Sequence, residues 1–241
     1  MARGKHQSLK SIPQDKRKPE SKEGLKIYLI ACEGECTEPN YINGLIKYHK
    51  SIKKIAAGTQ VILAPHGHSD PHGVLADLLE YPDREQFDEF WIVIDRDEVE
   101  LKGKGFGGHP EDNFLKTIKE SKENGVEVAC SNPCFEFWLV LHFEYRDTAC
   151  SRLDIQKKAL EKVNSLLDKK EKLKSIDELK SRKDLFYIIK DNLNTARINA
   201  EKLSENEKQK ENPSTGMYLL MDSLLGKLEK EEATEKEQKG E

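Results

Sequence analysis

Short apolar runs alternate with segments of helical spacing between residues 26 and 143, and this alternation is the feature that most limits the possible folds. A strand, a helix and a second strand form a right-handed crossover, so repeated alternation predicts a parallel sheet with helices on its faces. We therefore expect an α/β fold. The expected strands are 26–32, 60–65, 89–95 and 126–131, and the expected helices are 39–52, 70–81, 109–125 and 132–143.

The chain changes character after residue 150, where only helical patterns appear, over 151–172, 175–205 and 213–230. These helices could cover one face of the sheet or form a small helical cap. We expect four segments in all. They are a disordered basic arm at 1–24, an α/β core at 25–150, a helical extension packed on the core at 151–230, and a charged tail at 231–241.

The charge balance limits the partners of this chain. The 241 residues are 35% charged, yet the net charge is −4, so nucleic-acid binding would need a local basic patch. No apolar run approaches the ~20 residues of a membrane span, and the basic N-terminal segment lacks the apolar centre of a signal peptide. Five cysteines are an odd number for a secreted disulfide scaffold. We expect a cytoplasmic protein with no membrane partner.

Acidic residues follow the expected strands at their carboxyl ends. Glu33 follows the first strand, Asp95 and Asp97 follow the third, and Glu136 comes shortly after the fourth. In an open parallel sheet these ends meet at one edge, where the working crevice lies. Acidic residues after strands are often only helix caps and loop residues. Two clusters at one sheet edge favour a site instead.

The spacing of Asp95 and Asp97 suggests a metal ion. Residues two apart in an extended chain point to one side, so both carboxylates could address one cation. Mg²⁺ or Mn²⁺ takes oxygen ligands and keeps several waters, which leaves room for a substrate phosphate. Glu33 could complete the ligand set or act as a general base. A pair of such ions ~4 Å apart is typical of phosphodiester chemistry.

Four segments resemble the RloB-like family of bacterial proteins: CEGECTEPNYINGL (32–45), IVIDRDE (92–98), SNPCFEFWLVLHF (131–143) and NPSTGMYLLMDSLL (212–225). The resemblance implies a Toprim-like fold, the metal-binding α/β domain of topoisomerases, primases and OLD-type nucleases. A Toprim site uses a glutamate after its first strand and Asp-x-Asp after its third, which here are Glu33, Asp95 and Asp97. The resemblance also implies a role in phage defence, near restriction–modification genes or beside an ATPase partner.

These observations predict a Mg²⁺- or Mn²⁺-dependent nuclease that cleaves RNA or DNA in phage defence. Asp95 and Asp97 would hold the metal, Glu33 would be a ligand or the base, and Glu136 would assist. The alternative is a non-catalytic regulatory subunit of an ATPase-containing complex, whose acidic site binds a metal or nucleotide. Metal-dependent turnover separates the two hypotheses.

Further positions are candidates for contact with substrate phosphate. His66 and His68 lie in a polar turn after the second strand, and Lys102 and Lys104 lie in a Gly/Lys-rich loop after the acidic segment. Basic residues of the later helices could contact nucleic acid, namely Arg182, Lys183 and Arg197.

Three other features have a structural interpretation. We expect Glu38 to support the helix that begins beside it, and His142 to be a hydrogen-bonded core residue. The cysteine pairs 32/36 and 130/134 could bind zinc, but their spacing is wider than that of the usual two-residue zinc knuckle.

Overall fold

The central element is a five-stranded sheet with the order β2-β1-β3-β4-β5. Its first four strands are parallel, as the sequence predicts, and β5 pairs antiparallel with β4. Both central strands, β1 and β3, are almost continuously apolar, as expected of parallel strands covered on both faces. The strands are β1 (Ile27–Cys32), β2 (Gln60–Leu63), β3 (Glu89–Asp95), β4 (Val126–Asn132) and β5 (Ser214–Thr215).

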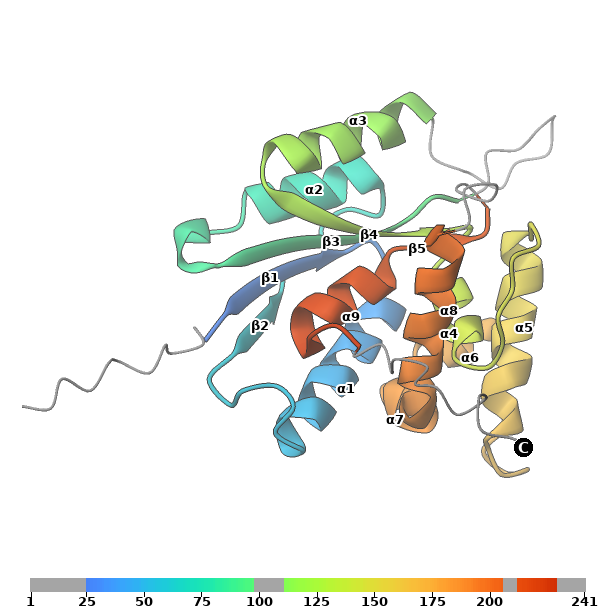
Figure 1. Cartoon of the computed structure of the whole chain (residues 1–241). Helices are drawn as coiled ribbons and strands as arrows, with labels where there is room; N and C mark the ends of the chain where they lie inside the picture. The colour runs from blue at the N-terminus through green and yellow to red at the C-terminus, as the bar shows by residue number, and fades with distance from the viewer. Residues whose placement is uncertain (1–24, 98–110, 206–211, 229–241) are drawn as a thin grey trace, which may run out of the picture.

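The computed structural model describes residues 25–97, 111–205 and 212–228 (Figure 1). The expected basic arm at 1–24 and the charged tail at 231–241 lie outside the described residues, as do Lys102 and Lys104. No helix within the described ranges is long and apolar enough to cross a membrane.

Helices cover both faces of the sheet (Figure 1). One face packs against α2 (Pro71–Leu79) and α3 (Glu111–Glu123), and the other against α1 (Thr37–Ser51), α4 (Glu136–Leu141) and the C-terminal helices. Side chains of β1 alternate between the two cores, because successive residues of a strand point to opposite faces. A mostly parallel, helix-flanked sheet of this kind is consistent with a Toprim-like α/β fold.

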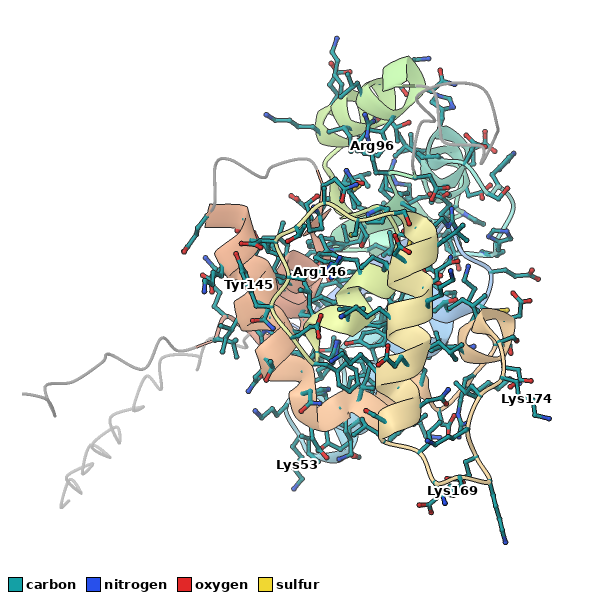
Figure 2. The ribbon with its side chains drawn as sticks, turned by 90° about the vertical axis from the view of Figure 1, so that its right-hand side faces the viewer. Lys53, Arg96, Tyr145, Arg146, Lys169 and Lys174 are labelled. Carbon is teal, nitrogen blue, oxygen red and sulfur yellow. The ribbon has the colours of Figure 1, made fainter. Side chains whose placement is uncertain are left out.

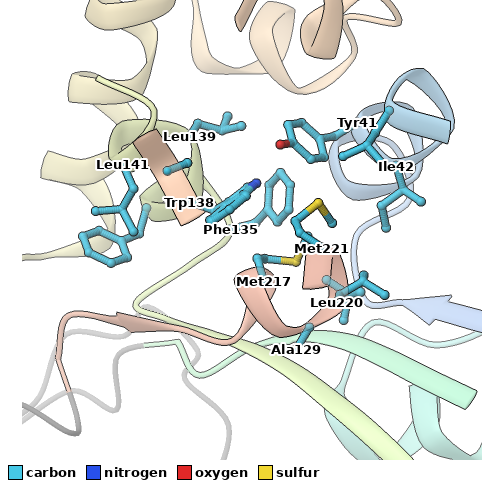
Figure 3. Close-up of a cluster of buried hydrophobic side chains, with 14 of the residues drawn as sticks. Tyr41, Ile42, Ala129, Phe135, Trp138, Leu139, Leu141, Met217, Leu220 and Met221 are labelled. Atoms are coloured by element: carbon cyan, nitrogen blue, oxygen red, sulfur yellow. The ribbon is translucent and has the colours of Figure 1, made fainter. Parts of the chain in front are cut away.

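The C-terminal helices share the larger of the two cores. Buried residues of α5, α7, α8 and α9 belong to the same cluster as those of β1, α1 and α4. Figure 3 shows its centre, where Tyr41 of α1, Trp138 of α4 and Met221 of α9 meet. These elements are α5 (Arg152–Ser165), α6 (Ile176–Lys180), α7 (Leu185–Ile189), α8 (Leu193–Glu205) and α9 (Met217–Leu225), with short 3₁₀ turns at Arg84–Gln86 and Lys190–Asn192.

Several expected boundaries were wrong. The helix expected over 132–143 begins only at Glu136, because β4 runs to Asn132 and proline disfavours helical backbone in the residue before it. The segment 175–205 is divided into α6, α7, a 3₁₀ turn and α8. The expectation of helices alone after residue 150 missed β5, because a two-residue strand has no periodicity to detect.

His142 lies in the core, as the sequence suggests. Its Nδ1 lies 3.0 Å from the carbonyl oxygen of Trp138, and its Nε2 lies 3.1 Å from the hydroxyl of Tyr41. Because a carbonyl can only accept, Nδ1 carries the hydrogen and Nε2 accepts from Tyr41. Burial lowers the pKa of His142 to about 4. The side chain is therefore neutral in the folded protein at neutral pH.

The buried His142 should make the folded protein less stable as the pH falls. Unfolded histidine binds a proton near its reference pKa of about 6.5, whereas folded His142 resists protonation down to pH about 4. The contribution of His142 to the free energy of unfolding is therefore complete above pH about 6.5. It is lost as the pH falls toward about 4, and the loss is about 3 kcal/mol at most. Urea denaturation across this pH range should show a smaller acid-side loss for His142→Gln than for wild type.

His66→Gln is the matched control, because His66 is exposed and should leave the acid-side loss unchanged. All three proteins retain the same carboxylates, so the comparison isolates His142. An identical pH dependence in wild type and His142→Gln would contradict the proposed role of burial.

Candidate active site

A cavity of about 430 Å³ lies at the carboxyl ends of β1 and β3, between the sheet and the helices α1, α4, α5 and α6. Its lining is dominated by charged side chains from segments far apart in the sequence. The acidic lining residues are Glu33, Glu35, Glu38, Asp95, Asp97, Glu136 and Asp177, and the basic ones are Arg152 and Lys180.

Glu33 joins the ends of the two central strands. Its backbone N–H donates to the carbonyl of Val93 at 2.9 Å, which extends the β1–β3 ladder by one residue. Its Oε2 accepts a hydrogen bond of 2.9 Å from the backbone N–H of Asp95. The pairing of β1 with β3 therefore places Glu33 and Asp95 together, as the strand-end argument expects.

Asp97 reaches the cavity by a different route from the one predicted. The condition of an extended chain after β3 is not met, because Asp97 has a φ of 50°, in the left-handed region. Aspartate tolerates this conformation better than most residues. Its N–H donates to the carbonyl of Pro133 at 3.1 Å, which fixes the turn against the segment between β4 and α4. Both aspartates are buried and line the same cavity despite the turn.

Arg96, between the two aspartates, points elsewhere. Its guanidinium lies over the ring of Phe114 at 4.4 Å, beside α3 on the opposite face of the sheet (Figure 2). The cationic side chain that meets Asp97 comes instead from Arg152, at the start of α5.

Glu38 contributes more than helix support. It lies in the first turn of α1, is buried, and lines the cavity. A Cβ added at Gly34 would come within 2.0 Å of its Oε2, so the carboxylate packs directly over the Gly34 backbone. A side chain at position 34 would therefore make the Glu38 carboxylate move, which is a local reason for the glycine of the Cys-Glu-Gly-Glu turn.

Glu136 faces the cavity from the first turn of α4. It is only 2% exposed, and its Oε1 lies 3.4 Å from Nζ of Lys180. The aromatic residues beside it belong to the core. A buried carboxylate is costly without a partner, and Lys180 provides one.

The sequence alone did not identify the two basic residues of the cavity lining, Arg152 and Lys180. Arg152 begins α5 and bonds to Asp97, and Lys180 ends α6 beside Glu136. The amide of Gln156, with its oxygen turned toward the two cations, accepts from Arg152 Nε at 3.3 Å and from Lys180 Nζ at 3.2 Å. Nothing in the local sequence distinguishes these residues from other charged residues on amphipathic helices, because only the tertiary packing brings them to the sheet edge.

The carboxylates repel one another. Burial raises the pKa of Glu38 to about 7, and the nearby carboxylates of Glu136 and Glu33 add to the shift. Burial also raises the pKa of Asp95 well above its ordinary value, and the surrounding carboxylates act in the same direction. The negative charge of the cavity is thus not fully balanced by Arg152 and Lys180.

An excess of carboxylate oxygens is the donor chemistry that suits Mg²⁺ or Mn²⁺. Within residues 25–97, 111–205 and 212–228, however, no three His, Cys, Asp or Glu side chains are arranged to hold a metal ion. The donor set therefore fits such an ion in kind, while Asp97 and Glu136 are engaged with cationic side chains.

The predicted histidine contacts do not line the cavity. Nδ1 of His68 lies 2.7 Å from Oδ1 of Asp77, whose Oδ2 accepts from the backbone N–H groups of Gly67 and His68. His66 is exposed, and from this turn it is Ser69 that reaches the cavity.

The remaining basic candidates of the later helices do not line the cavity either, and Lys183 is exposed. Arg197 is buried against Asp222 at 2.5 Å, and Arg182 pairs with Asp184 at 2.7 Å. Surface lysines such as Lys169 and Lys174 lie on the loop between α5 and α6, far from Arg96 (Figure 2). All five cysteines lie in the described ranges, and no disulfide joins them.

The raised pKa of Glu38 predicts that the metal-free protein loses stability as the pH rises. A folded carboxyl with a pKa above its unfolded value contributes stability below the unfolded pKa, about 4.5, and loses it as the pH passes the folded value of about 7. Glu38→Gln should therefore raise the free energy of unfolding at about pH 8 and have little effect at about pH 4.5. Urea denaturation in EDTA measures both.

Glu35→Gln is the matched control, because Glu35 lines the same cavity but is exposed. It should change stability little at either pH. Equal effects of Glu38→Gln at both pH values would show that the substitution acts through packing rather than charge.

Comparison with known proteins gives one match. The family model described as RloB-like protein matches residues 28–224, which include every element of the cavity. No match was found among curated proteins or among solved structures. The matched span covers most of the chain, so this protein belongs to the RloB-like family.

Proposed function

We propose that this protein is a nuclease that hydrolyses phosphodiester bonds of RNA or DNA with the help of Mg²⁺ or Mn²⁺. One observation carries the proposal. Carboxylates that follow β1 and β3, or lie in the first turns of α1 and α4, converge in one cavity. Their mutual repulsion is a standing cost that a bound divalent cation would remove.

The residues have distinct roles in this proposal. Asp95 and Asp97 hold the ion, and Glu136 assists from the opposite side. Glu33 is a further ligand or the general base that takes a proton from the attacking water, a role that its position beside Asp95 permits. When bound, the ion supplies Lewis-acid activation of the scissile phosphate.

The biological setting is part of the same proposal. A role in phage defence and an ATPase partner follow from the resemblance to the RloB-like family and not from the geometry of the cavity. The family membership supports this setting, while the substrate, RNA or DNA, is left to experiment.

A second candidate is a non-catalytic subunit that binds a metal or nucleotide in a complex with an ATPase. It is favoured by the ion pairs of Asp97 and Glu136, which keep these carboxylates from acting as ligands in the arrangement described. Such a subunit would bind a ligand in the cavity without turnover.

The nuclease proposal predicts that the purified full-length protein cuts labelled tRNA or DNA with Mg²⁺ or Mn²⁺ and does not cut in EDTA. Asp95→Ala/Asp97→Ala should lose at least about 100-fold of this rate, because both proposed ligands are removed. Asp168→Ala/Asp191→Ala, which removes two exposed aspartates outside the cavity, should cut like wild type.

Two outcomes would count against the nuclease proposal. Cutting that persists in Asp95→Ala/Asp97→Ala would place the activity elsewhere. Metal binding by wild type, lost in this variant and without cutting of either substrate, would favour the non-catalytic subunit.

A further inference from the structure

We propose that Arg152 and Lys180, held side by side by Gln156, bind backbone phosphates of the nucleic acid beside the carboxylates. The inference rests on the proposed function, since it assigns the substrate-binding face of the same cavity. It also moves this face to the C-terminal helices from the loops predicted by the sequence.

The two cations occupy one wall of the cavity. Arg152 is the first residue of α5 and Lys180 is the last residue of α6, and both line the cavity. Their side chains are 34% and 31% exposed, so each combines a partly buried stem with a head that solvent or a ligand can reach. A guanidinium offers a planar pair of donors that matches two phosphate oxygens, and an ammonium adds a point charge.

Gln156 fixes the spacing of this pair. It lies one helical turn after Arg152 and is 8% exposed, and the amide orientation that satisfies its neighbours turns the oxygen toward both Arg152 and Lys180. Because α5 and α6 are separate helices, this single amide ties their cationic ends together. Gln156 is thus a positioning residue, since its acceptor oxygen holds two like charges close to each other.

In the structure described, ion pairs with carboxylates hold Arg152 and Lys180 in the cavity. Arg152 bonds to Asp97 and Lys180 to Glu136, and these are two of the carboxylates assigned to metal binding. A divalent cation brings the same charge to the carboxylates as the two side chains together. If Asp97 and Glu136 held a metal ion, Arg152 and Lys180 would lose these two partners and would turn to the phosphate.

Release can be tested without metal and without catalysis. Asp97→Asn/Glu136→Gln removes the carboxylates of these two ion pairs and should make Arg152 and Lys180 more available to phosphate in EDTA. Fluorescence anisotropy with a labelled single-stranded RNA, and with DNA of the same sequence, should then show binding about tenfold tighter than wild type. Glu35→Gln/Asp177→Asn removes the same charge from exposed positions of the cavity wall and should tighten binding much less.

The gain in binding must come from the two cations. Adding Arg152→Gln/Lys180→Gln to Asp97→Asn/Glu136→Gln gives a fourfold variant without unpaired charges at these positions, so it is expected to fold. It should lose the gain, and the slope of log Kd against log salt should fall by about one to two. Lys157→Gln/Lys169→Gln, which removes two exposed cations outside the cavity, should keep the gain.

Gln156 has its own test in the Asp97→Asn/Glu136→Gln background. Gln156→Leu should weaken nucleic-acid binding, whereas Gln156→Asn, which keeps an uncharged amide acceptor, should retain more of it. A merely structural role would give the same binding for both variants once thermal unfolding shows that they are folded.

The results separate this inference from the nuclease proposal. Binding that depends on Arg152 and Lys180, without cutting in Mg²⁺, would support the inference and overturn the nuclease. Cutting in Mg²⁺ with equal binding by the fourfold variant and its parent would overturn the inference and leave the nuclease standing. An equal gain in nucleic-acid binding from Glu35→Gln/Asp177→Asn would also overturn the inference. It would show that the substitutions act only by reducing the general repulsion between the acidic cavity and the phosphates.

Discussion

The pairing of β1 with β3 is the interaction on which the rest of the structure depends. These strands form the centre of the sheet and bury their side chains on both faces. Their register ends with Cys32 opposite Val93, so the next residue, Glu33, reaches the backbone N–H of Asp95. The contacts that build the core therefore also bring two carboxylates together, and the fold bears a local electrostatic cost at this edge of the sheet.

The C-terminal helices offset part of the electrostatic repulsion between these carboxylates. They bury apolar residues against α1 and α4, and the same packing delivers Arg152 and Lys180 to Asp97 and Glu136. Burial raises the pKa values of Glu38 and Asp95, and the neighbouring carboxylates add to both shifts. A cavity lined by both acidic and basic side chains follows, which suits a ligand containing both a cation and a phosphate.

The sequence was informative wherever local pattern determines structure. Alternating strands and helices predicted the parallel sheet, and the rule that strand ends meet at one edge brought Glu33, Asp95 and Asp97 together correctly. Features set by tertiary packing were not accessible. The turn at Asp97 depends on a hydrogen bond to Pro133, and Arg152 and Lys180 join the cavity only because α5 and α6 pack against it. Strand β5 was missed because two residues carry no period.

The most direct test of a divalent-cation site is a crystal structure of the full-length protein grown with Mn²⁺, with anomalous diffraction to locate the ion. Our account predicts a peak in the cavity with oxygens of Asp95 and of Glu33 or Asp97 about 2 Å away, and with Arg152 no longer bonded to Asp97. A cavity without manganese, in which Arg152 and Asp97 remain paired, would contradict it.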